Sequence, residues 1–119
     1  MSYKVLVCGS RDWTDRKSIN KVFKELPIDT IIIHGAARGV DTLAHEYADA
    51  YGFKIDKYPA NWELYGKRAG FIRNLEMLDQ SPDLVLAFQK NKSRGTQHTI
   101  DNARKRGILV KVYDDESTF

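Results

Sequence analysis

The sequence predicts a doubly wound α/β domain in which a five-stranded parallel sheet lies between two layers of helices. Short apolar segments alternate with segments of helical periodicity along the 119 residues, and Gly or Pro separates many of them. One apolar segment, Ile31 to Ile33, contains no polar residue. Alternating strands and helices pair the strands in parallel through right-handed crossovers, and strands covered on both faces are continuously apolar. We therefore expect residues 1–119 to form one domain, a small three-layer sandwich.

The first half of the chain is expected to contain three strands and two helices. The strands span residues 3–8, 30–33 and 54–58. Thr14 or Asp15 can cap a helix that Pro27 ends. Its apolar face is formed by Ile19, Val22, Phe23 and Leu26. A second helix follows Asp41 and stops at Gly52, which tolerates the left-handed conformation of a helix end. Its inward face comprises Leu43, Ala44, Tyr47, Ala48 and Tyr51.

The second half is expected to contain two strands and two helices. Residues 59–67 have no regular pattern, so we expect an irregular segment there. The next helix repeats apolar residues at Ala69, Ile72, Leu75 and Leu78. A strand over 84–88, a helix over 96–106 and a strand over 108–113 complete the domain. The acidic tail from Asp114 is expected to be loose.

The composition is that of an ordinary globular domain. Hydrophobic residues make up 42% of the chain and charged residues 29%, and no apolar run approaches the ~20 residues of a membrane span. The net charge of +3 neither requires nor excludes an anionic partner. The single cysteine, Cys8, has no partner for an internal disulfide, so we expect a cytoplasmic location. We interpret Cys8 as a small buried residue, because nothing in the sequence argues for a partner base.

Glycine and arginine gather in the segments that follow the strands. These segments are GSRDW (9–13), HGAARGVD (34–41), YPANWELYGKRAG (58–70) and QKNKSRGT (89–96). In a doubly wound sheet, ligands bind at the carboxyl ends of the strands. Glycine lets the backbone approach a ligand, helix N-termini present free N–H groups, and arginine matches phosphate oxygens. Each arginine alone is typical of a solvated surface, but together Arg11, Arg38 and Arg94 predict an anion or nucleotide site.

Several other residues have two open interpretations. Asp41 can cap its helix or reach a ribose hydroxyl. Trp13, Trp62 and Tyr65 can stack on a base or pack in the fold. The three histidines, His34, His45 and His98, are scattered and accompany no cysteine pair, so we expect surface or loop positions and no metal site.

Four segments carry a resemblance to a known family. They are GSRDW, IIHGAARGVDTLA, YPANWELYGKRAGFIRNLEML and PDLVLAF…SRGTQHTI, which follow or surround successive expected strands in order over nearly the whole chain. The chain resembles the YspA/cpYpsA-related branch of the SLOG superfamily. That superfamily has a Rossmann-like fold and includes the Lonely Guy phosphoribohydrolases, the DNA-processing protein DprA and nucleotide-sensing domains of bacterial defence systems.

The resemblance implies a nucleotide or nucleotide-derived ligand whose phosphate lies on the loops after the first, second and fourth strands. The ligand-binding residues that it implies are Gly9, Ser10, Arg11, Gly35, Arg38, Gly39, Asp41, Ser93, Arg94, Gly95 and Thr96. Arg73 stands where Lonely Guy enzymes keep a catalytic arginine. Ser93 to Thr96 stand where those enzymes carry Pro-Gly-Gly-x-Gly-Thr-x-x-Glu, but three residues past Thr96 the chain has Thr99 instead of the catalytic glutamate.

The missing glutamate leaves three interpretations of the function. The first is binding without turnover, as a sensor or sequestering protein, because a cradle of glycine and arginine needs no base. The second is a hydrolase or transferase that acts on a nucleotide N-glycosidic bond, with Arg73 and with Asp12, Asp41 or Glu76 in place of the absent carboxylate. The third is DNA binding, which we place last because charge is nearly balanced and no basic stripe is present.

The expected partners follow from the resemblance together with the composition and the charge. We expect a nucleotide-like small molecule, no cofactor, no nucleic acid and no membrane. Related SLOG proteins pair through helices, so we expect a homo-oligomer, to which the segment ELYGKRAGF (63–71) can contribute an edge.

Overall fold

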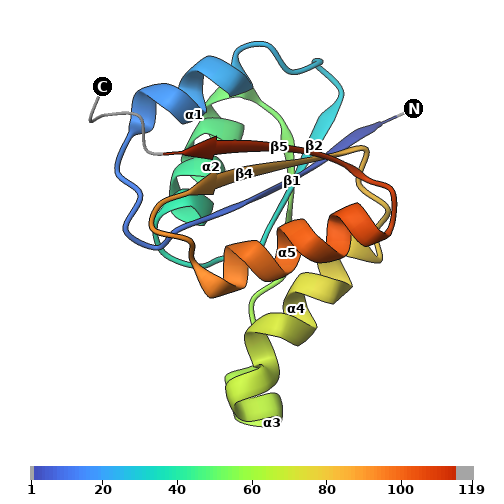
Figure 1. Cartoon of the computed structure of the whole chain (residues 1–119). Coiled ribbons are helices and arrows are strands. Elements are labelled where there is room, and N and C mark those ends of the chain that lie inside the picture. Colours follow the sequence, from blue (N-terminus) through green and yellow to red (C-terminus); the bar gives the residue numbers. More distant parts are fainter. Residues whose placement is uncertain (1, 115–119) are drawn as a thin grey trace.

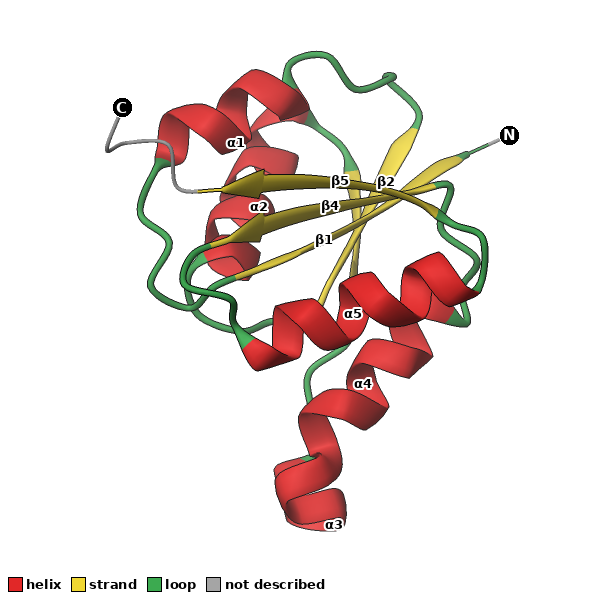
Figure 2. Cartoon of the chain, viewed as in Figure 1, coloured by secondary structure: helices red, strands yellow, loops and turns green. Residues whose placement is uncertain are grey.

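The sheet of this protein is parallel throughout and has helices on both faces (Figures 1 and 2). The structure is a computed structural model that describes residues 2–114. Its strands are β1 (Tyr3–Gly9), β2 (Thr30–His34), β3 (Lys54–Lys57), β4 (Leu84–Gln89) and β5 (Leu109–Asp114). They lie in the order β3-β2-β1-β4-β5, and all four pairings are parallel. This confirms the predicted α/β fold with a five-stranded parallel sheet. The tail expected to be loose after Asp114 lies outside the described residues.

Helices cover the two faces of the sheet in pairs. They are α1 (Arg16–Phe23), α2 (Val40–Tyr51), the short α3 (Trp62–Tyr65), α4 (Ala69–Leu78) and α5 (Arg94–Lys105), with a 3-10 turn, η1, over Gly66–Arg68. α1 and α2 lie on one face and α4 and α5 on the other, while α3 projects from the lower end of the molecule (Figure 1). Within residues 2–114, none of the helices is long and apolar enough to cross a lipid bilayer.

Alternate residues of the central strands form two separate cores. On β1, Val5 and Val7 pack in the core beneath α1 and α2, whereas Leu6 and Cys8 pack in the core beneath α4 and α5. Burying one such aliphatic side chain stabilises the fold by about 1.5–3 kcal/mol. Because both faces of β1 and β4 are covered, neither strand has a polar face, which explains their continuous apolar sequences.

Three helix boundaries differ from the predicted ones. α1 ends at Phe23 instead of reaching Leu26, since Pro27 disfavours the helical conformation in the residue before it. α2 begins at Val40 with Gly39 as its N-cap, so Asp41 lies inside the helix and is not the cap. α5 begins at Arg94, two residues earlier than predicted, because Ser93 caps it through its side chain.

The segment expected to be irregular, 59–67, contains α3. The side chain of Asn61 caps this helix by accepting a hydrogen bond from the backbone N–H of Leu64 at 3.1 Å. Four residues are too few to show an apolar period, so the sequence did not predict this helix. Its side chains Trp62, Leu64 and Tyr65 are exposed.

The order of the strands fixes where a ligand site can form. The chain moves outward from β1 to β2 and β3, and then returns across the sheet to β4, which pairs with the opposite edge of β1. The connections that leave the carboxyl ends of β1 and β4 therefore run to different faces. A crevice opens at such a point, and ligands of doubly wound domains bind there.

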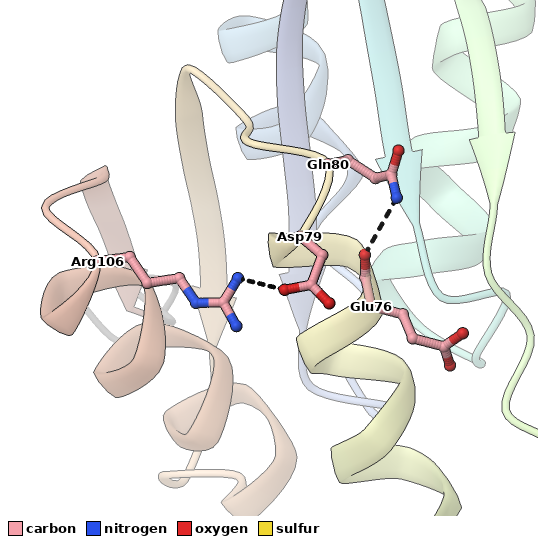
Figure 3. Close-up of polar contacts among 4 residues, drawn as sticks. All are labelled: Glu76, Asp79, Gln80 and Arg106. Atoms are coloured by element: carbon pink, nitrogen blue, oxygen red, sulfur yellow. Dashed lines mark hydrogen bonds and ion pairs between the residues drawn. The ribbon is translucent and has the colours of Figure 1, made fainter.

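The helices that flank this crevice, α4 and α5, are tied together at their far ends. Nη1 of Arg106, just after α5, lies 2.8 Å from Oδ1 of Asp79, just after α4, while the side-chain amide of Gln80 donates to the backbone oxygen of Glu76 (Figure 3). An exposed ion pair of this kind contributes only about 0–1 kcal/mol. The position of α4 therefore depends mainly on its buried residues, which include Met77.

Candidate functional site

A cavity of about 480 Å³ opens at the carboxyl ends of β1 and β4. We call it the main cavity. Its walls come from the loop after β1, the loop after β2 with the start of α2, the segment from α3 through α4, and the loop after β4 with the first turns of α5. The Gly- and Arg-rich segments that the sequence placed at strand ends therefore meet around one space.

Asp41 is a buried carboxylate in the wall of the main cavity. Its Oδ2 accepts hydrogen bonds from the backbone N–H groups of Gly35, at 3.1 Å, and Ala37, at 3.2 Å. Burial raises the pKa of Asp41 to about 6, against the opposing effect of these hydrogen bonds. The N–H of Ala36, between the two donors, donates to Nδ1 of His34. These three N–H groups are thus used within the protein and are not available to bind an anion.

Arg73 reaches from α4 into the site and is fixed by oxygen atoms around it. Its Nη1 donates to the backbone oxygens of Gly35 and Tyr58, and its Nε donates to Oδ1 of Asn74 at 3.0 Å. Burial lowers the pKa of Arg73, while the negative charge of Asp41 acts in the opposite direction. Within residues 2–114 its Nη2 makes no hydrogen bond. Arg73 therefore brings a positioned cation with two unused N–H donors to the cavity.

Gly9 and Gly35 lie where parts of the protein approach one another closely. A Cβ on Gly9 would overlap the backbone oxygen of Phe88 and the side chain of Val40. A Cβ on Gly35 would overlap the guanidinium group of Arg73. These glycines let the loops approach one another and let Arg73 lie across the end of β2.

Ser10 joins the loops that follow β1 and β4. Its hydroxyl accepts a hydrogen bond from the backbone N–H of Lys90 at 2.7 Å and donates to the backbone oxygen of the same residue at 2.9 Å. Its own N–H donates to the backbone oxygen of Phe88 at 3.0 Å. Ser10 is buried, so its hydroxyl sets the shape of the cavity by holding these loops together.

The N-terminus of α5 forms another part of the wall. Ser93 caps the helix, and its Oγ accepts a hydrogen bond from the hydroxyl of Thr96 at 3.2 Å. The backbone N–H groups of Arg94 and Gly95 make no hydrogen bond within residues 2–114, as is usual for a first helical turn. They lie at the end of a twelve-residue helix that carries a partial positive charge.

A second cavity, of about 320 Å³, adjoins the main one. The two cavities share Arg11, Ala37, Trp62 and Arg73 as lining residues. The second cavity is completed by the loop after β2, which includes Arg38, and by Pro59 and Ala60.

The structure brings most of the predicted site residues to these cavities. The main cavity is lined by Gly9, Ser10, Arg11, Asp12, Asp41, Arg73, Ser93, Gly95 and Thr96. The second cavity is lined by Arg11, Gly35, Arg38 and Arg73. Gly39 and Arg94 line neither cavity.

Some residues of the main cavity were missing from the sequence-based prediction. Lys67, Phe71, Asn74 and Lys90 line it. Lys67 belongs to the segment 58–70, which the sequence placed after a strand. Because residues 59–67 were expected to be irregular, the direction of the Lys67 side chain could not be predicted. Burial separates the three aromatic residues whose roles were left open. Trp13 packs against Phe88 in the core, whereas Trp62 and Tyr65 are exposed, and Trp62 lines both cavities.

The expectation that the histidines lie apart at the surface was wrong for one pair. His34 is buried at the end of β2, and its Nε2 lies 3.0 Å from Nδ1 of His45 on α2. Because Nδ1 of His34 accepts the N–H of Ala36, Nε2 must carry the proton and donate it to His45. Burial, followed by the charges of His45 and Lys57, lowers the pKa of His34 to about 4. Eleven residues separate the pair in sequence, so only the crossover from β2 to α2 brings them together.

Two further chemistries are relevant to this region: a cysteine nucleophile and a metal site. The thiol of Cys8 is buried, as predicted, and burial together with the charge of Asp41 raises its pKa, so it is not a thiolate nucleophile. Among the residues that the structure describes, no group of three His, Cys, Asp or Glu side chains is arranged to hold a metal ion.

Comparison with known proteins assigns the family. A sequence profile described as the YspA, cpYpsA-related SLOG family matches residues 3–65, more than half of the chain. The chain belongs to this SLOG family. A relative matches this SLOG chain over nearly its whole length: Gene 61 protein of Mycobacterium phage D29 is 36% identical over 122 residues, which cover 95% of this chain and 98% of that protein.

A solved structure supports the SLOG fold. The X-ray structure of DNA processing protein A (DprA) from Streptococcus pneumoniae superposes with a TM-score of 0.79, at 23% sequence identity over 93% of this chain. This SLOG chain spans 50% of the length of that DprA chain. At this level of identity the similarity concerns the fold alone.

Thr99, which the resemblance places where Lonely Guy enzymes carry a glutamate, lies in the wall of the main cavity of this SLOG protein. Thr99 is buried, and its hydroxyl donates to the backbone oxygen of Gly95 at 3.3 Å. A threonine hydroxyl cannot act as a carboxylate base at neutral pH.

Proposed function

We propose that this protein binds a nucleotide or nucleotide-derived ligand through its phosphate in the main cavity, as a sensor or sequestering protein. The observation that carries the proposal is the convergence of strand-end loops on one cavity at the point where strand order reverses. Its volume of about 480 Å³ is in the range of small-molecule sites.

The charges of the main cavity favour an anion. Its basic lining residues are Arg11, Lys67, Arg73 and Lys90, and its acidic ones are Asp12 and Asp41. The first N–H groups of α5 add a partial positive charge on the same side. A phosphate near Gly95 can therefore accept hydrogen bonds from the helix and from cationic side chains.

Two exposed aromatic side chains favour a nucleobase in addition to a phosphate. Trp62 and Phe71 line the main cavity, with 51% and 38% of their surfaces exposed. Phe71 stacks on His98, with ring centroids 4.2 Å apart, so its ring is held in place. Aromatic rings that are exposed at a cavity are suitable surfaces for base stacking.

We expect a ribonucleoside 5′-monophosphate to bind the protein, and Trp62→Ala to weaken this binding about ten-fold or more because a stacking surface is lost. Isothermal titration calorimetry with the four common monophosphates, their parent nucleosides and inorganic phosphate measures the effect. Trp62→Ala should leave the affinity for inorganic phosphate unchanged. Leu64→Ala, also exposed on α3 but absent from both cavities, is the matched control. Absence of binding by every monophosphate would refute the proposal.

Hydrolysis of an N-glycosidic bond is the second candidate, and Asp41 is the observation that favours it. This buried carboxyl lines the main cavity beside Arg73, and its pKa of about 6 is suited to proton transfer near neutrality. Incubation of each monophosphate with the protein, followed by chromatography for free base and ribose 5-phosphate, tests it. Release that Asp41→Asn abolishes while Asp12→Asn preserves would favour the enzyme over the sensor. Binding without release would exclude this candidate for the ligands tested.

A further inference from the structure

We propose that the ligand carries a second phosphoryl group, separate from the one in the main cavity, and that this group binds between Arg11, Arg38 and Arg73 in the second cavity. The inference rests on the proposed function and names the class of nucleotide: one with two anionic groups. The shared residues Arg11, Ala37, Trp62 and Arg73 join the cavities, so one molecule can extend from the first into the second.

Asp41 in the main cavity acts electrostatically on Arg11 and Arg73, but the lining of the second cavity itself is cationic. It contains three arginines and no aspartate or glutamate. The main cavity, in contrast, includes the carboxyl groups of Asp12 and Asp41. After burial, the positive charge of Arg11 is the main factor that lowers the pKa of Arg73, so these two guanidinium groups are close enough to repel each other. An anion between them would remove this repulsion.

The arginines also have hydrogen-bond donors to offer. Within residues 2–114, the side chains of Arg11 and Arg38 make no hydrogen bond and no ion pair, and Nη2 of Arg73 is likewise unused. Guanidinium groups match the oxygens of a phosphoryl group and can bind them in pairs. The backbone offers less, because the N–H groups of Gly35, Ala36 and Ala37 already donate to Asp41 and His34. The three arginine side chains therefore supply the donors on which the proposal rests.

The three arginines come from different parts of the fold, so only the folded chain brings them to one cavity. Arg11 follows β1, Arg38 lies between β2 and α2, and Arg73 lies on α4. Gly35 has no side chain where Arg73 crosses it, and Ala36 adopts a left-handed φ of 57°. A non-glycine residue in that conformation carries strain, which is frequent at ligand sites.

The test compares ligands that differ by one phosphoryl group. For the base that binds best as a 5′-monophosphate, calorimetry is repeated with the 5′-diphosphate and the 3′,5′-bisphosphate of the same nucleoside. We expect at least one of these to bind about ten-fold or more tightly than the monophosphate. Arg38→Gln should abolish that gain and leave the affinity for the monophosphate within about two-fold, since Arg38 lines only the second cavity. Arg104→Gln, which removes an exposed arginine in the last turn of α5, should change neither affinity.

Two results would overturn the inference while the proposed function stands. One is that the monophosphate binds and neither doubly phosphorylated nucleotide binds more tightly. The other is that Arg38→Gln weakens the monophosphate and the doubly phosphorylated ligand to the same extent. If no monophosphate binds, the proposed function itself fails.

Discussion

Gly39→Ala should lower the free energy of unfolding by about 3 kcal/mol or more, the largest loss that we expect from a single methyl group in this protein. Gly39 has a φ of 74°, which costs an L-residue about 1–2 kcal/mol. A Cβ at this position would also lie within 3.0 Å of the backbone oxygens of Ser10 and Arg11. Backbone atoms cannot move aside as a flexible side chain can, so relief requires the loop after β1 to shift away from α2.

The matched control for this variant is Gly107→Ala. Gly107 has the same φ of 74°, but nothing lies within 4 Å of its expected Cβ. It should therefore lose only the conformational cost, about 1 kcal/mol. Urea unfolding of both variants measures the two losses, and their difference isolates the contact between the loops. Equal losses would contradict the tight packing between Gly39 and the loop after β1.

The fold was predictable because it depends on local patterns. Ile31 to Ile33 indicated a strand buried on both faces, and the period through Ile19 and Phe23 indicated an amphipathic helix. The site was predictable as a region for a related reason: parallel strands direct their carboxyl ends to one edge, so Gly- and Arg-rich loops must meet there.

Which of the predicted residues line each cavity was not predictable from the sequence. Arg38 and Arg94 both follow a strand and both are exposed, yet Arg38 lines the second cavity and Arg94 lines neither cavity. The direction of a loop side chain depends on tertiary contacts that leave no period in the sequence. The same limit applies to Asp41, which was expected either to cap α2 or to contact a ligand. The sequence did not predict that it accepts hydrogen bonds from the backbone N–H groups of Gly35 and Ala37, in the loop before the helix.

The stability of the protein should change little between pH 4 and pH 6.5 as far as Asp41 and His34 are concerned, because two large effects oppose each other. Burial raises the pKa of Asp41 from 3.8 to about 6. The folded state therefore binds a proton that the unfolded state has released. The contribution of Asp41 to the free energy of unfolding is fully present below pH 3.8 and falls by about 3 kcal/mol as the pH rises through 6.

His34 acts in the opposite direction. Burial, followed by the charges of His45, Lys57 and Arg73, lowers its pKa from 6.5 to about 4. The folded state excludes a proton that the unfolded state accepts in this range. The stability from His34 is therefore present above pH 6.5 and is lost as pH falls through 4, also by about 3 kcal/mol.

Single substitutions should expose each effect by removing the other. Asp41→Asn keeps an oxygen for the N–H groups of Gly35 and Ala37 but cannot titrate, so its stability relative to wild type should rise by about 3 kcal/mol from pH 4 to pH 7. His34→Gln keeps an acceptor and a donor, and its relative stability should fall by a similar amount over the same range. Urea unfolding at unit pH intervals measures both, and every other titrating group cancels in the comparison with wild type. If the stability of a variant relative to wild type does not change with pH, the replaced group keeps its ordinary pKa in the folded protein, and the prediction for that group is wrong.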